Sequence, residues 1–377
     1  MRVALVHDWL TGLRGGEKVL EVFCELFPDA TLFTLLHVAG ATSPRIESLP
    51  IRTAFTQKLP GVKRFYRWYL PLHPWAIESL DLDGFDLVLS SSHCVAKGVR
   101  PAEGALHICY CHTPMRYVWD RFEDYFGSGL KAKLLYGPVA AKLRAWDRAS
   151  AGRVDHFVAN STHVAGRIDE YYGRAADAVI PPPVDTEFYV PSQSDGLSGL
   201  SGLSDMSDGE SFCLVVSALV PYKRIDLAIE AFRHRKDELV IVGSGPSAAR
   251  LKATAPPNVR FLGWTDDATL RALYQTCRAC LLVGVEDFGI VPLEAQACGA
   301  PVVAYGKGGA LDTVRDGETG VFFHEPTPEA LSRAIDRVYS LGVNKTLLRE
   351  WALGFSRETF QKRMREFIET RAKAAGL

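Results

Sequence analysis

Short apolar runs alternate with amphipathic segments along almost the whole chain. The runs are rich in Val, Ile and Leu and have the length of buried strands, whereas the segments between them repeat apolar residues at helical spacing. In the first half, the pattern predicts strands at 3–7, 31–35, 87–90, 106–111, 156–159 and 178–180, and helices at roughly 17–27, 130–149 and 164–172.

The second half repeats this alternation. It predicts strands at 212–217, 239–242, 260–262, 279–283 and 301–304, and helices at roughly 224–234, 248–254, 267–276, 293–298 and 329–340. Strands that alternate with helices form a parallel sheet with helices on both faces. We therefore expect an α/β protein with two Rossmann-like parallel-sheet domains that face an interdomain cleft.

The length of 377 residues also favours two domains, because it exceeds what one core usually supports. Three prolines at 181–183 precede a stretch at 192–209 that repeats Gly-Leu-Ser and is otherwise mostly Ser, Asp and Gly, so it is expected to be a disordered loop. The predicted divisions are a first domain at 1–185, a linker at 186–211, a second domain at 212–355, and a terminal helix at 356–377 that packs back on the first domain.

Composition narrows the class of protein. A net charge of −1 gives no global reason to expect a nucleic-acid partner. The chain starts directly with a strand, so we expect no secretory signal, and no apolar stretch approaches the roughly 20 residues of a membrane span. The eight cysteines lie mostly in apolar runs, as reduced thiols would, which indicates a cytoplasmic protein.

Two carboxylates, Glu286 and Glu294, lie around a glycine turn where a strand is expected to pass into a helix. Such a turn is the usual anion cradle of α/β folds, because free amides and the helix dipole converge there. Carboxylates bind phosphate poorly but suit the hydroxyl groups of a sugar and a ribose. The pattern therefore points to a nucleotide-sugar site.

Lys223 and Arg224 follow Pro221, at what the pattern predicts to be the first turn of a helix. Cations at a helix N-terminus oppose the dipole, so their position asks for an explanation. A bound diphosphate would supply one. The alternative is a solvated basic pair without a ligand.

The first domain offers two further candidates. Gly15 and Gly16 stand between the first strand and the first helix without the spacing of a NAD-binding loop, and would let backbone approach a ligand. His112 follows a predicted strand directly, where a side chain would face the cleft. The alternative role for this histidine is structural hydrogen bonding.

One segment, residues 55–75, carries four basic residues, no acidic residue and six aromatic rings. Basic residues interleaved with Trp and Tyr suit a membrane interface with anionic lipid. A packed helix pair with a solvated face is the alternative.

With these motifs together, the chain resembles the retaining glycosyltransferases of family 4, which have the GT-B fold. The Glu286–Glu294 segment with its Phe-Gly turn is the most specific part, and Val-Pro-Tyr-Lys-Arg-Ile-Asp and His-Thr-Pro reinforce it. Within that family the motifs look most like mannosyltransferases of bacterial O-antigen and exopolysaccharide synthesis. One position departs: many members have an arginine where this chain has Ala218, which leaves Arg224 as the alternative second ligand of the diphosphate.

The resemblance implies a role for each matched residue. Glu286, His112 and Lys223 would lie at the reacting centre. Donor binding would involve Lys223, Arg224, the amides of Phe288, Gly289 and Ile290, Glu294 on the ribose, and Gly15 and Gly16. The first domain would be the acceptor side and the second would bind the nucleotide sugar.

The implied reaction transfers a hexose, with mannose favoured, from a nucleoside-diphosphate sugar, with GDP-mannose favoured. The acceptor would be a glycan or a polyprenyl-diphosphate-linked saccharide, on the cytoplasmic side of the membrane. No Asp-x-Asp motif occurs in a suitable loop, so no metal or other cofactor is expected. The alternatives are another GT-B reaction on nucleotide sugars, epimerisation or hydrolysis, and a non-catalytic subunit that binds sugar nucleotides.

Overall fold

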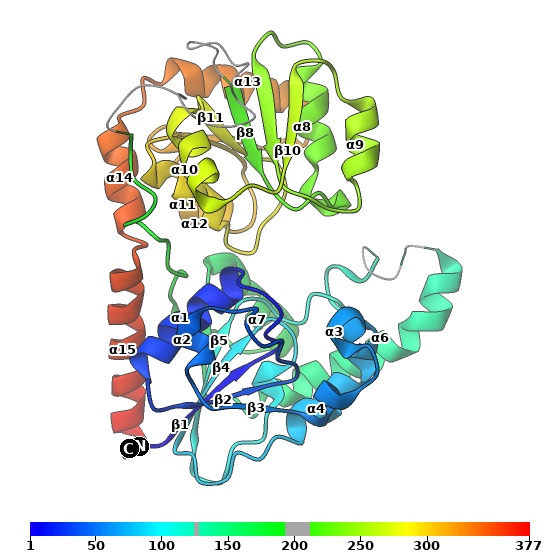
Figure 1. Cartoon of the computed structure of the whole chain (residues 1–377), viewed down its shortest axis with the longest axis vertical. Helices are drawn as coiled ribbons and strands as arrows, with labels where there is room; N and C mark the ends of the chain where they lie inside the picture. Colours follow the sequence, from blue (N-terminus) through cyan, green and yellow to red (C-terminus); the bar gives the residue numbers. More distant parts are fainter. Residues whose placement is uncertain (124–126, 128, 193–211) are drawn as a thin grey trace. The chain divides into compact units, whose positions relative to one another are not determined.

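Each half of the chain folds around a sheet whose strands alternate their side chains between its two faces. The computed structural model describes residues 1–123, 127, 129–192 and 212–377. They form two units, one made of Met1–Pro183 with Glu358–Leu377 and the other of Val184–Arg357 (Figure 1). Each unit contains one parallel sheet, as the alternating pattern predicts.

The first sheet has the strand order β3-β2-β1-β4-β5-β6-β7, and all of its strands are parallel. The strands are β1 Val3–His7, β2 Thr31–Thr34, β3 Ile51–Thr53, β4 Leu87–Ser92, β5 Leu106–Cys111, β6 His156–Ala159 and β7 Ala178–Val179. The helices are α1 Gly15–Leu26, α2 Pro44–Glu47, α3 Val62–Phe65, α4 His73–Glu78, α6 Leu130–Ala151, α7 Thr162–Tyr172 and α15 Arg357–Ala374, with 3₁₀ turns η1 Phe55–Lys58, η2 Tyr66–Leu72 and η3 Ala96–Gly98.

Each face of the first sheet has its own core. In β1, Ala4 and Val6 pack with residues of α4 and α6, whereas Val3 and Leu5 pack on the other face with residues of α1 and α15. A strand that is covered on both faces must be apolar at successive positions. This is why the strand sequences are continuous apolar runs.

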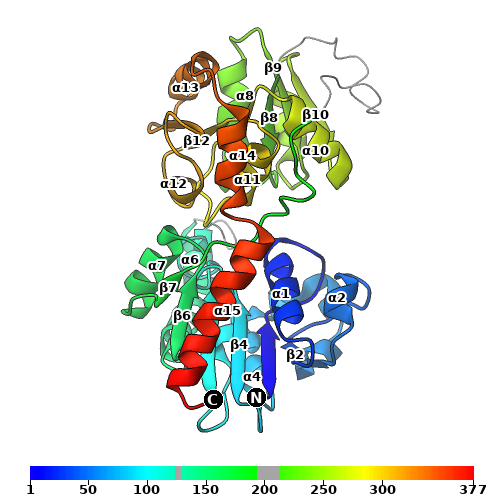
Figure 2. The same cartoon turned by 90° about the vertical axis from the view of Figure 1, so that its left-hand side faces the viewer.

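The last helix of the chain, α15, packs on the first unit (Figure 2). Phe360, Met364 and Ile368 follow one another at four-residue spacing and are all buried in the core on that face. The ring of Phe360 lies 5.8 Å from the ring of Phe23 and 5.6 Å from that of Tyr110. Both ends of the chain thus contribute to one unit.

The second sheet has the order β10-β9-β8-β11-β12-β13, again with parallel strands. The strands are β8 Phe212–Val216, β9 Glu238–Val242, β10 Val259–Gly263, β11 Ala279–Leu282, β12 Val302–Tyr305 and β13 Gly320–Phe323. The helices are α8 Ile225–Phe232, α9 Ala248–Thr254, α10 Asp267–Thr276, α11 Ile290–Ala297, α12 Ala310–Thr313, α13 Pro328–Ser340 and α14 Lys345–Leu353, with the 3₁₀ turn η4 Pro221–Lys223.

Alternation again separates two cores. In β8, Cys213 and Val215 pack with residues of α8 and α13, whereas Phe212 and Leu214 pack with residues of α10 and α11. The two-layer covering of each sheet therefore follows from the same alternation in both halves.

Part of the segment expected to be a linker packs on the second unit instead. Arg349 of α14 donates hydrogen bonds to the carbonyls of Thr186, at 2.6 Å, and Tyr189, at 2.5 Å. The Tyr189 side chain is buried, with its ring 5.8 Å from that of Tyr274. Residues 193–211, which include most of the Ser/Gly-rich stretch, lie outside the described part of the chain.

The sequence pattern did not predict the edge strands β3 and β13 or the short helices between β3 and β4. The two strands have only three and four residues, and each has a single neighbour in its sheet. Runs this short carry little periodicity, so they are predicted only in some cases: the two-residue edge strand β7 was predicted at 178–180, whereas β3 and β13 were not. Within the described residues, no helix is both long and apolar enough to span a bilayer.

Three histidines of the first unit, His7, His73 and His107, are buried and resist protonation. Burial lowers the pKa of His7 to about 3 and those of His73 and His107 to about 4, against an ordinary value of 6.5. In the unfolded chain these side chains regain their ordinary pKa. As the pH falls below about 6.5, the unfolded state therefore takes up protons that the folded state refuses, and stability decreases.

We predict that the first unit loses stability between pH 6.5 and pH 4.5, measured by urea unfolding followed through tryptophan fluorescence. His107→Gln should reduce the slope of stability against pH by about one proton, which is about 1.4 kcal/mol per pH unit. His234→Gln provides the control, because His234 belongs to the second unit and its substitution should not alter the stability of the first unit. Equal slopes in the wild type and His107→Gln would contradict the prediction.

Candidate functional site

The reversal of strand order in the second sheet places two loops beside each other. From β8 the chain adds β9 and β10 on one side, and then β11, β12 and β13 on the other. The carboxyl ends of β8 and β11 therefore flank the topological switch point, where open α/β sheets bind ligands. The loop after β8 carries Lys223 and the loop after β11 carries Glu286.

Lys223 and Glu286 form an ion pair across these loops. Both side chains are largely shielded from solvent, with 14% of the Lys223 and 25% of the Glu286 side chain exposed. The sequence predicted that Lys223 and Arg224 lie in the first turn of a helix, and this was wrong. Lys223 ends η4, Arg224 is the N-cap of α8 with φ at 54°, and the helix begins at Ile225.

Arg224 faces a different partner. Its Nε lies 3.3 Å from both carboxylate oxygens of Asp226, and both side chains are 44% exposed. The two adjacent cations thus have separate acidic partners.

Two glycines allow the backbones at this site to approach closely. A Cβ on Gly284 would lie 2.9 Å from the backbone of Lys223, and a Cβ on Gly309 would overlap the backbone of Phe288. Any larger residue would push these loops apart. The glycines therefore hold the loops after β8, β11 and β12 together.

The segment from Glu286 to α11 presents backbone amides. The carbonyl of Glu286 accepts a hydrogen bond of 2.8 Å from the amide of Gly309. Gly289 has φ at 90°, a left-handed conformation that glycine adopts without strain, and it is the N-cap of α11. The amides of Phe288, Gly289 and Ile290 thus lie at the N-terminus of α11, where a negative group is favoured.

Glu294 is buried in α11, with 6% of its surface exposed. The hydroxyl of Tyr274 donates a hydrogen bond of 3.1 Å to its carboxylate. Burial and the charge of Glu294 raise the pKa of Tyr274, so the phenol stays protonated and acts as a donor. Sequence reasoning missed Tyr274, which lies in a helical pattern that gives no sign of its partner.

The first sheet has its own switch point, between β1 and β4. The predicted residues Gly15, Gly16 and His112 follow β1 and β5 and lie near it. A Cβ on Gly16 would lie 3.5 Å from the ring of His7 and 3.8 Å from Nε2 of His112. Among the described residues, and apart from its chain neighbours and its own helix backbone, no atom would lie within 4 Å of a Cβ on Gly15. The structure thus brings Gly16 and His112 together.

One hydroxyl connects two histidines at this place. Ser91 Oγ lies 2.8 Å from His112 Nε2 and 3.1 Å from His7 Nδ1. Burial, followed by the neighbouring His93, His7 and Arg116, lowers the pKa of His112 well below its ordinary value. The imidazole of His112 is therefore neutral near pH 7 and can donate or accept hydrogen bonds.

Asp8 fixes the loop after β4. Its Oδ2 accepts the amides of His93, at 2.8 Å, and Cys94, at 3.0 Å, and lies 3.0 Å from His93 Nδ1. Its Oδ1 accepts the amides of Val95, at 2.6 Å, and Ala96, at 2.8 Å. Sequence reasoning singled out the loop that begins with Asp8 but not this residue, because its partners lie more than 80 positions away.

The chain matches two families of glycosyltransferase domains. Residues 21–188 match the family model described as Glycosyltransferase Family 4, and residues 204–350 match the one described as Glycosyl transferases group 1. The first match lies mainly in the first unit and the second match in the second unit.

Curated relatives carry related names. A D-inositol 3-phosphate glycosyltransferase of Acidothermus cellulolyticus is 34% identical over 220 residues, which are 52% of this chain and 48% of that protein. A glycogen synthase of Thermus thermophilus is 36% identical over 118 residues, which are 31% of this chain and 27% of that protein. The chain thus matches about half, or less, of the length of these relatives.

Solved structures resemble the chain over nearly its full length. A structure of HepE from Anabaena in complex with UDP has a TM-score of 0.71 at 18% identity and covers 98% of this chain and 100% of that one. Sucrose-phosphate synthase from Thermosynechococcus elongatus has a TM-score of 0.72 at 17% identity, covering 99% and 100%. The chain therefore has the GT-B fold, and its two parts are similar to the models of Glycosyltransferase Family 4 and Glycosyl transferases group 1.

Proposed function

We propose that the chain is a retaining glycosyltransferase that moves a hexose from a nucleoside-diphosphate sugar to a glycan or lipid-linked acceptor. Mannose is the favoured sugar and GDP-mannose the favoured donor, in the synthesis of a bacterial surface polysaccharide. The Lys223–Glu286 pair at the switch point of the second sheet carries the proposal.

A lysine and a glutamate side by side suit the two ends of a sugar diphosphate. The ammonium of Lys223 would bind the phosphate next to the sugar, with the amides of Phe288, Gly289 and Ile290 nearby. The carboxylate of Glu286 would then accept hydrogen bonds from the sugar hydroxyls. Donor binding would exchange the ion pair for these two contacts.

Glu294 would bind the ribose. Glu294 is a buried carboxylate that accepts a hydrogen bond from Tyr274, and it would accept further hydrogen bonds from the two ribose hydroxyls. Tyr274 would act as a positioning residue that holds the carboxylate in place.

The transfer step would rely on electrostatics. The acceptor hydroxyl attacks the anomeric carbon on the face that the diphosphate leaves, the bond between that carbon and the phosphate oxygen breaks, and the departing phosphate takes the acceptor proton. Negative charge grows on the phosphate, where Lys223 stabilises it. His112, neutral and hydrogen-bonded to Ser91 through Nε2, would contact the donor sugar. A metal ion and a cofactor are not part of this proposal.

Two of the similar proteins have structures with nucleotides or nucleotide sugars bound. HepE is described in complex with UDP and with UDP-glucose, and starch synthase IV with ADP and acarbose. These complexes support a nucleotide-sugar donor, and their nucleotides differ in the base. The preference for GDP and mannose rests on the sequence motifs alone.

The acceptor side is proposed to work at a membrane surface. Trp68 and Trp75, in the basic aromatic segment 55–75, are 81% and 67% exposed. Tryptophan and basic side chains favour the boundary between headgroups and hydrocarbon. We place the protein in the cytoplasm, in contact with the inner face of the membrane and with no nucleic-acid partner.

We predict that Lys223→Ala and Glu294→Gln each lower kcat/KM for transfer by about 10²-fold or more, because each removes a group that binds the donor in the transition state. Radiolabelled transfer from GDP-mannose to a lipid-linked acceptor measures this. Lys252→Ala and Glu318→Gln, both at exposed positions of the second unit, should retain full activity. Near wild-type rates in both Lys223→Ala and Glu294→Gln, with circular dichroism spectra unchanged, would contradict the proposed donor-binding roles of these residues.

A thermal-shift comparison of GDP, UDP and ADP tests donor binding directly. A ligand that binds only the folded state stabilises it by about 2.7 kcal/mol at a hundredfold excess over Kd. GDP should give the largest shift, and Lys223→Ala should abolish it. A larger shift with UDP than with GDP would change the predicted base of the donor to uracil, and the donor would still be a nucleoside-diphosphate sugar. Absence of a shift with all three nucleotides would overturn the proposed function.

A further inference from the structure

Four side chains of the first unit form a connected series from the start of α1 to His112. Oε1 of Glu17 lies 4.0 Å from Nε2 of His7. Nδ1 of the same histidine lies 3.1 Å from Oγ of Ser91, and this oxygen lies 2.8 Å from Nε2 of His112. Glu17, His7 and Ser91 are all buried. The carboxylate is therefore connected to His112 through the ring of His7 and the hydroxyl of Ser91.

Each of the two imidazole rings carries a single N–H at pH 7. Burial lowers the pKa of His7 to about 3 and that of His112 well below its ordinary value, so both rings are neutral. A neutral imidazole donates through one nitrogen and accepts through the other. The partner of one nitrogen therefore decides what the other nitrogen of the same ring can do.

The hydroxyl of Ser91 couples the two rings. It has one proton, and within the described residues its hydrogen-bond partners are His7 and His112. Because Ser91 is fully buried, this proton goes to one ring while the oxygen accepts from the other. If both rings donated to Ser91, or both accepted from it, a buried polar group would lack a partner, which is costly.

Glu17 selects one of the two arrangements. Its Oε2 accepts the amide of Arg14 at 3.1 Å, and its Oε1 faces Nε2 of His7, which has no hydrogen-bond partner in the described part of the chain. An ionised carboxylate favours an N–H at this nitrogen and disfavours a lone pair. With Nε2 protonated, His7 accepts from Ser91 through Nδ1. Ser91 then accepts from Nε2 of His112, whose Nδ1 becomes an acceptor.

Nδ1 is the nitrogen of His112 that is left for a ligand. Nε2 lies against Ser91, whereas Nδ1 has no hydrogen-bond partner among the residues that the structure describes. The residue is only partly buried and directly follows β5. A ligand group at this place therefore meets an acceptor and has to supply the donor.

We propose that Glu17, His7 and Ser91 are positioning residues. They hold His112 in the tautomer with Nε2 protonated, so that His112 accepts a hydrogen bond from a hydroxyl of the donor sugar through Nδ1. This inference rests on the proposed function, to which the contact between His112 and the sugar belongs. It adds the direction of that hydrogen bond, and with it the requirement that the sugar donates.

The tautomer of His112 is measured by ¹⁵N NMR of the full chain without ligand, because protonated and unprotonated ring nitrogens have well-separated shifts. Burial raises the pKa of Glu17, so the spectra are recorded at pH 8, where the carboxyl is ionised. The chain has ten histidines, and the signals of His112 are those that disappear in His112→Gln. Nε2 should be protonated and Nδ1 unprotonated. A proton on Nδ1 in about half of the molecules or more would overturn the proposal.

Glu17→Gln should reverse the tautomer at nearly constant size. The amide oxygen is needed to accept from Arg14, so the NH₂ group takes the place of Oε1 and points a donor at His7. Nε2 of His7 then accepts, both following hydrogen bonds reverse, and Nδ1 of His112 gains the proton. An unchanged tautomer would overturn the proposal. If this variant does not fold, the spectrum of the wild type alone still decides.

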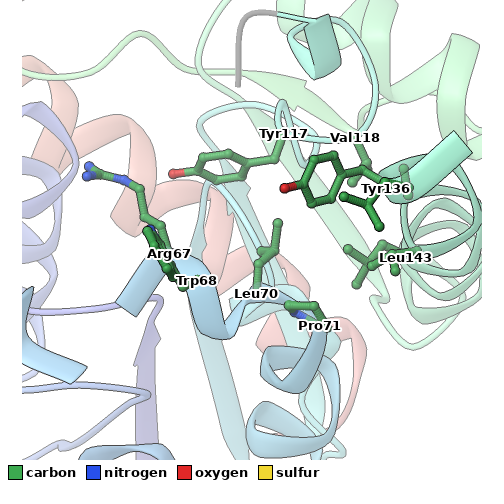
Figure 3. Close-up of a pocket in the computed structure, with 11 residues that line it drawn as sticks. Arg67, Trp68, Leu70, Pro71, Tyr117, Val118, Tyr136 and Leu143 are labelled. Carbon is green, nitrogen blue, oxygen red and sulfur yellow. The ribbon is translucent and has the colours of Figure 1, made fainter. Parts of the chain in front are cut away.

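Two charge changes serve as controls, and both should leave the tautomer unchanged. Glu25→Gln removes the same charge from an exposed position of α1, roughly 12 Å along the helix from Glu17. Arg67→Gln removes a charge that acts on His93, whose ring lies 6.4 Å from that of His112. Figure 3 shows Arg67 at the edge of an apolar pocket between η2 and α6, with its guanidinium pointing away from Leu143. Reversal in either control would mean that charge alone sets the tautomer, and would overturn the proposal.

Ser91→Ala breaks the connection between the two rings. In this background Glu17→Gln should no longer change the tautomer of His112, because no proton links His7 to His112. A through-space effect of the lost charge would persist without the hydroxyl. An equal response to Glu17→Gln with and without Ser91 would therefore refute the coupling.

Analogues of GDP-mannose with fluorine in place of single hydroxyls extend the test to the sugar. Fluorine cannot donate, so the analogue altered at the hydroxyl that faces His112 should bind the wild type about ten-fold more weakly than GDP-mannose. In Glu17→Gln, where His112 donates, the loss should shrink at this one position and stay the same at the others. Identical losses in both proteins would overturn the proposed direction of the hydrogen bond.

The two kinds of measurement separate this inference from the proposed function. A chain that binds no nucleotide sugar would refute the glycosyltransferase and the sugar as ligand, while the tautomer of His112 would stand on the spectra. A chain that binds GDP-mannose and carries the proton of His112 on Nδ1 would refute this inference alone.

Discussion

Close contact between the loops after β8 and β11 is the constraint on which the candidate site depends. A parallel sheet brings the carboxyl ends of its strands to one edge. Where the strand order reverses, between β8 and β11, the loops that follow these strands turn in opposite directions and leave room for a ligand. Gly284 lets the Lys223 backbone approach, so that Lys223 reaches Glu286. Without that approach, the cation and the carboxylate would not converge on one ligand.

The first unit repeats this geometry with different chemistry. At its switch point, Asp8 fixes the loop after β4 through four backbone amides, and Ser91 connects His7 and His112. The groups are neutral imidazoles and backbone rather than an ion pair. Such groups suit contact with sugar hydroxyls.

The fold was largely predictable from the sequence because strands covered on both faces are apolar throughout. These apolar runs can be recognised without knowing which strands lie next to each other. The predicted strands at 106–111 and 156–159 coincide with β5 and β6. The short edge strands β3 and β13 could not be predicted in this way, because their conformation depends on a neighbouring strand. The start of α8 also differs from the prediction. Arg224 has a left-handed backbone conformation with φ at 54°, which the sequence does not predict because arginine rarely adopts it. Motif spacing identified Lys223, Glu286 and Glu294, but Tyr274, Asp8 and Ser91 have partners far away in the sequence and needed the fold.

The central claim is that the Lys223–Glu286 pair receives a nucleoside diphosphate, and a crystal structure of the full chain with GDP tests it most directly. The account predicts a phosphate oxygen within about 2.7–2.9 Å of Lys223 Nζ, the ribose hydroxyls on Glu294, and Glu286 released from the lysine. A diphosphate bound elsewhere, with Lys223 still paired to Glu286, would contradict it.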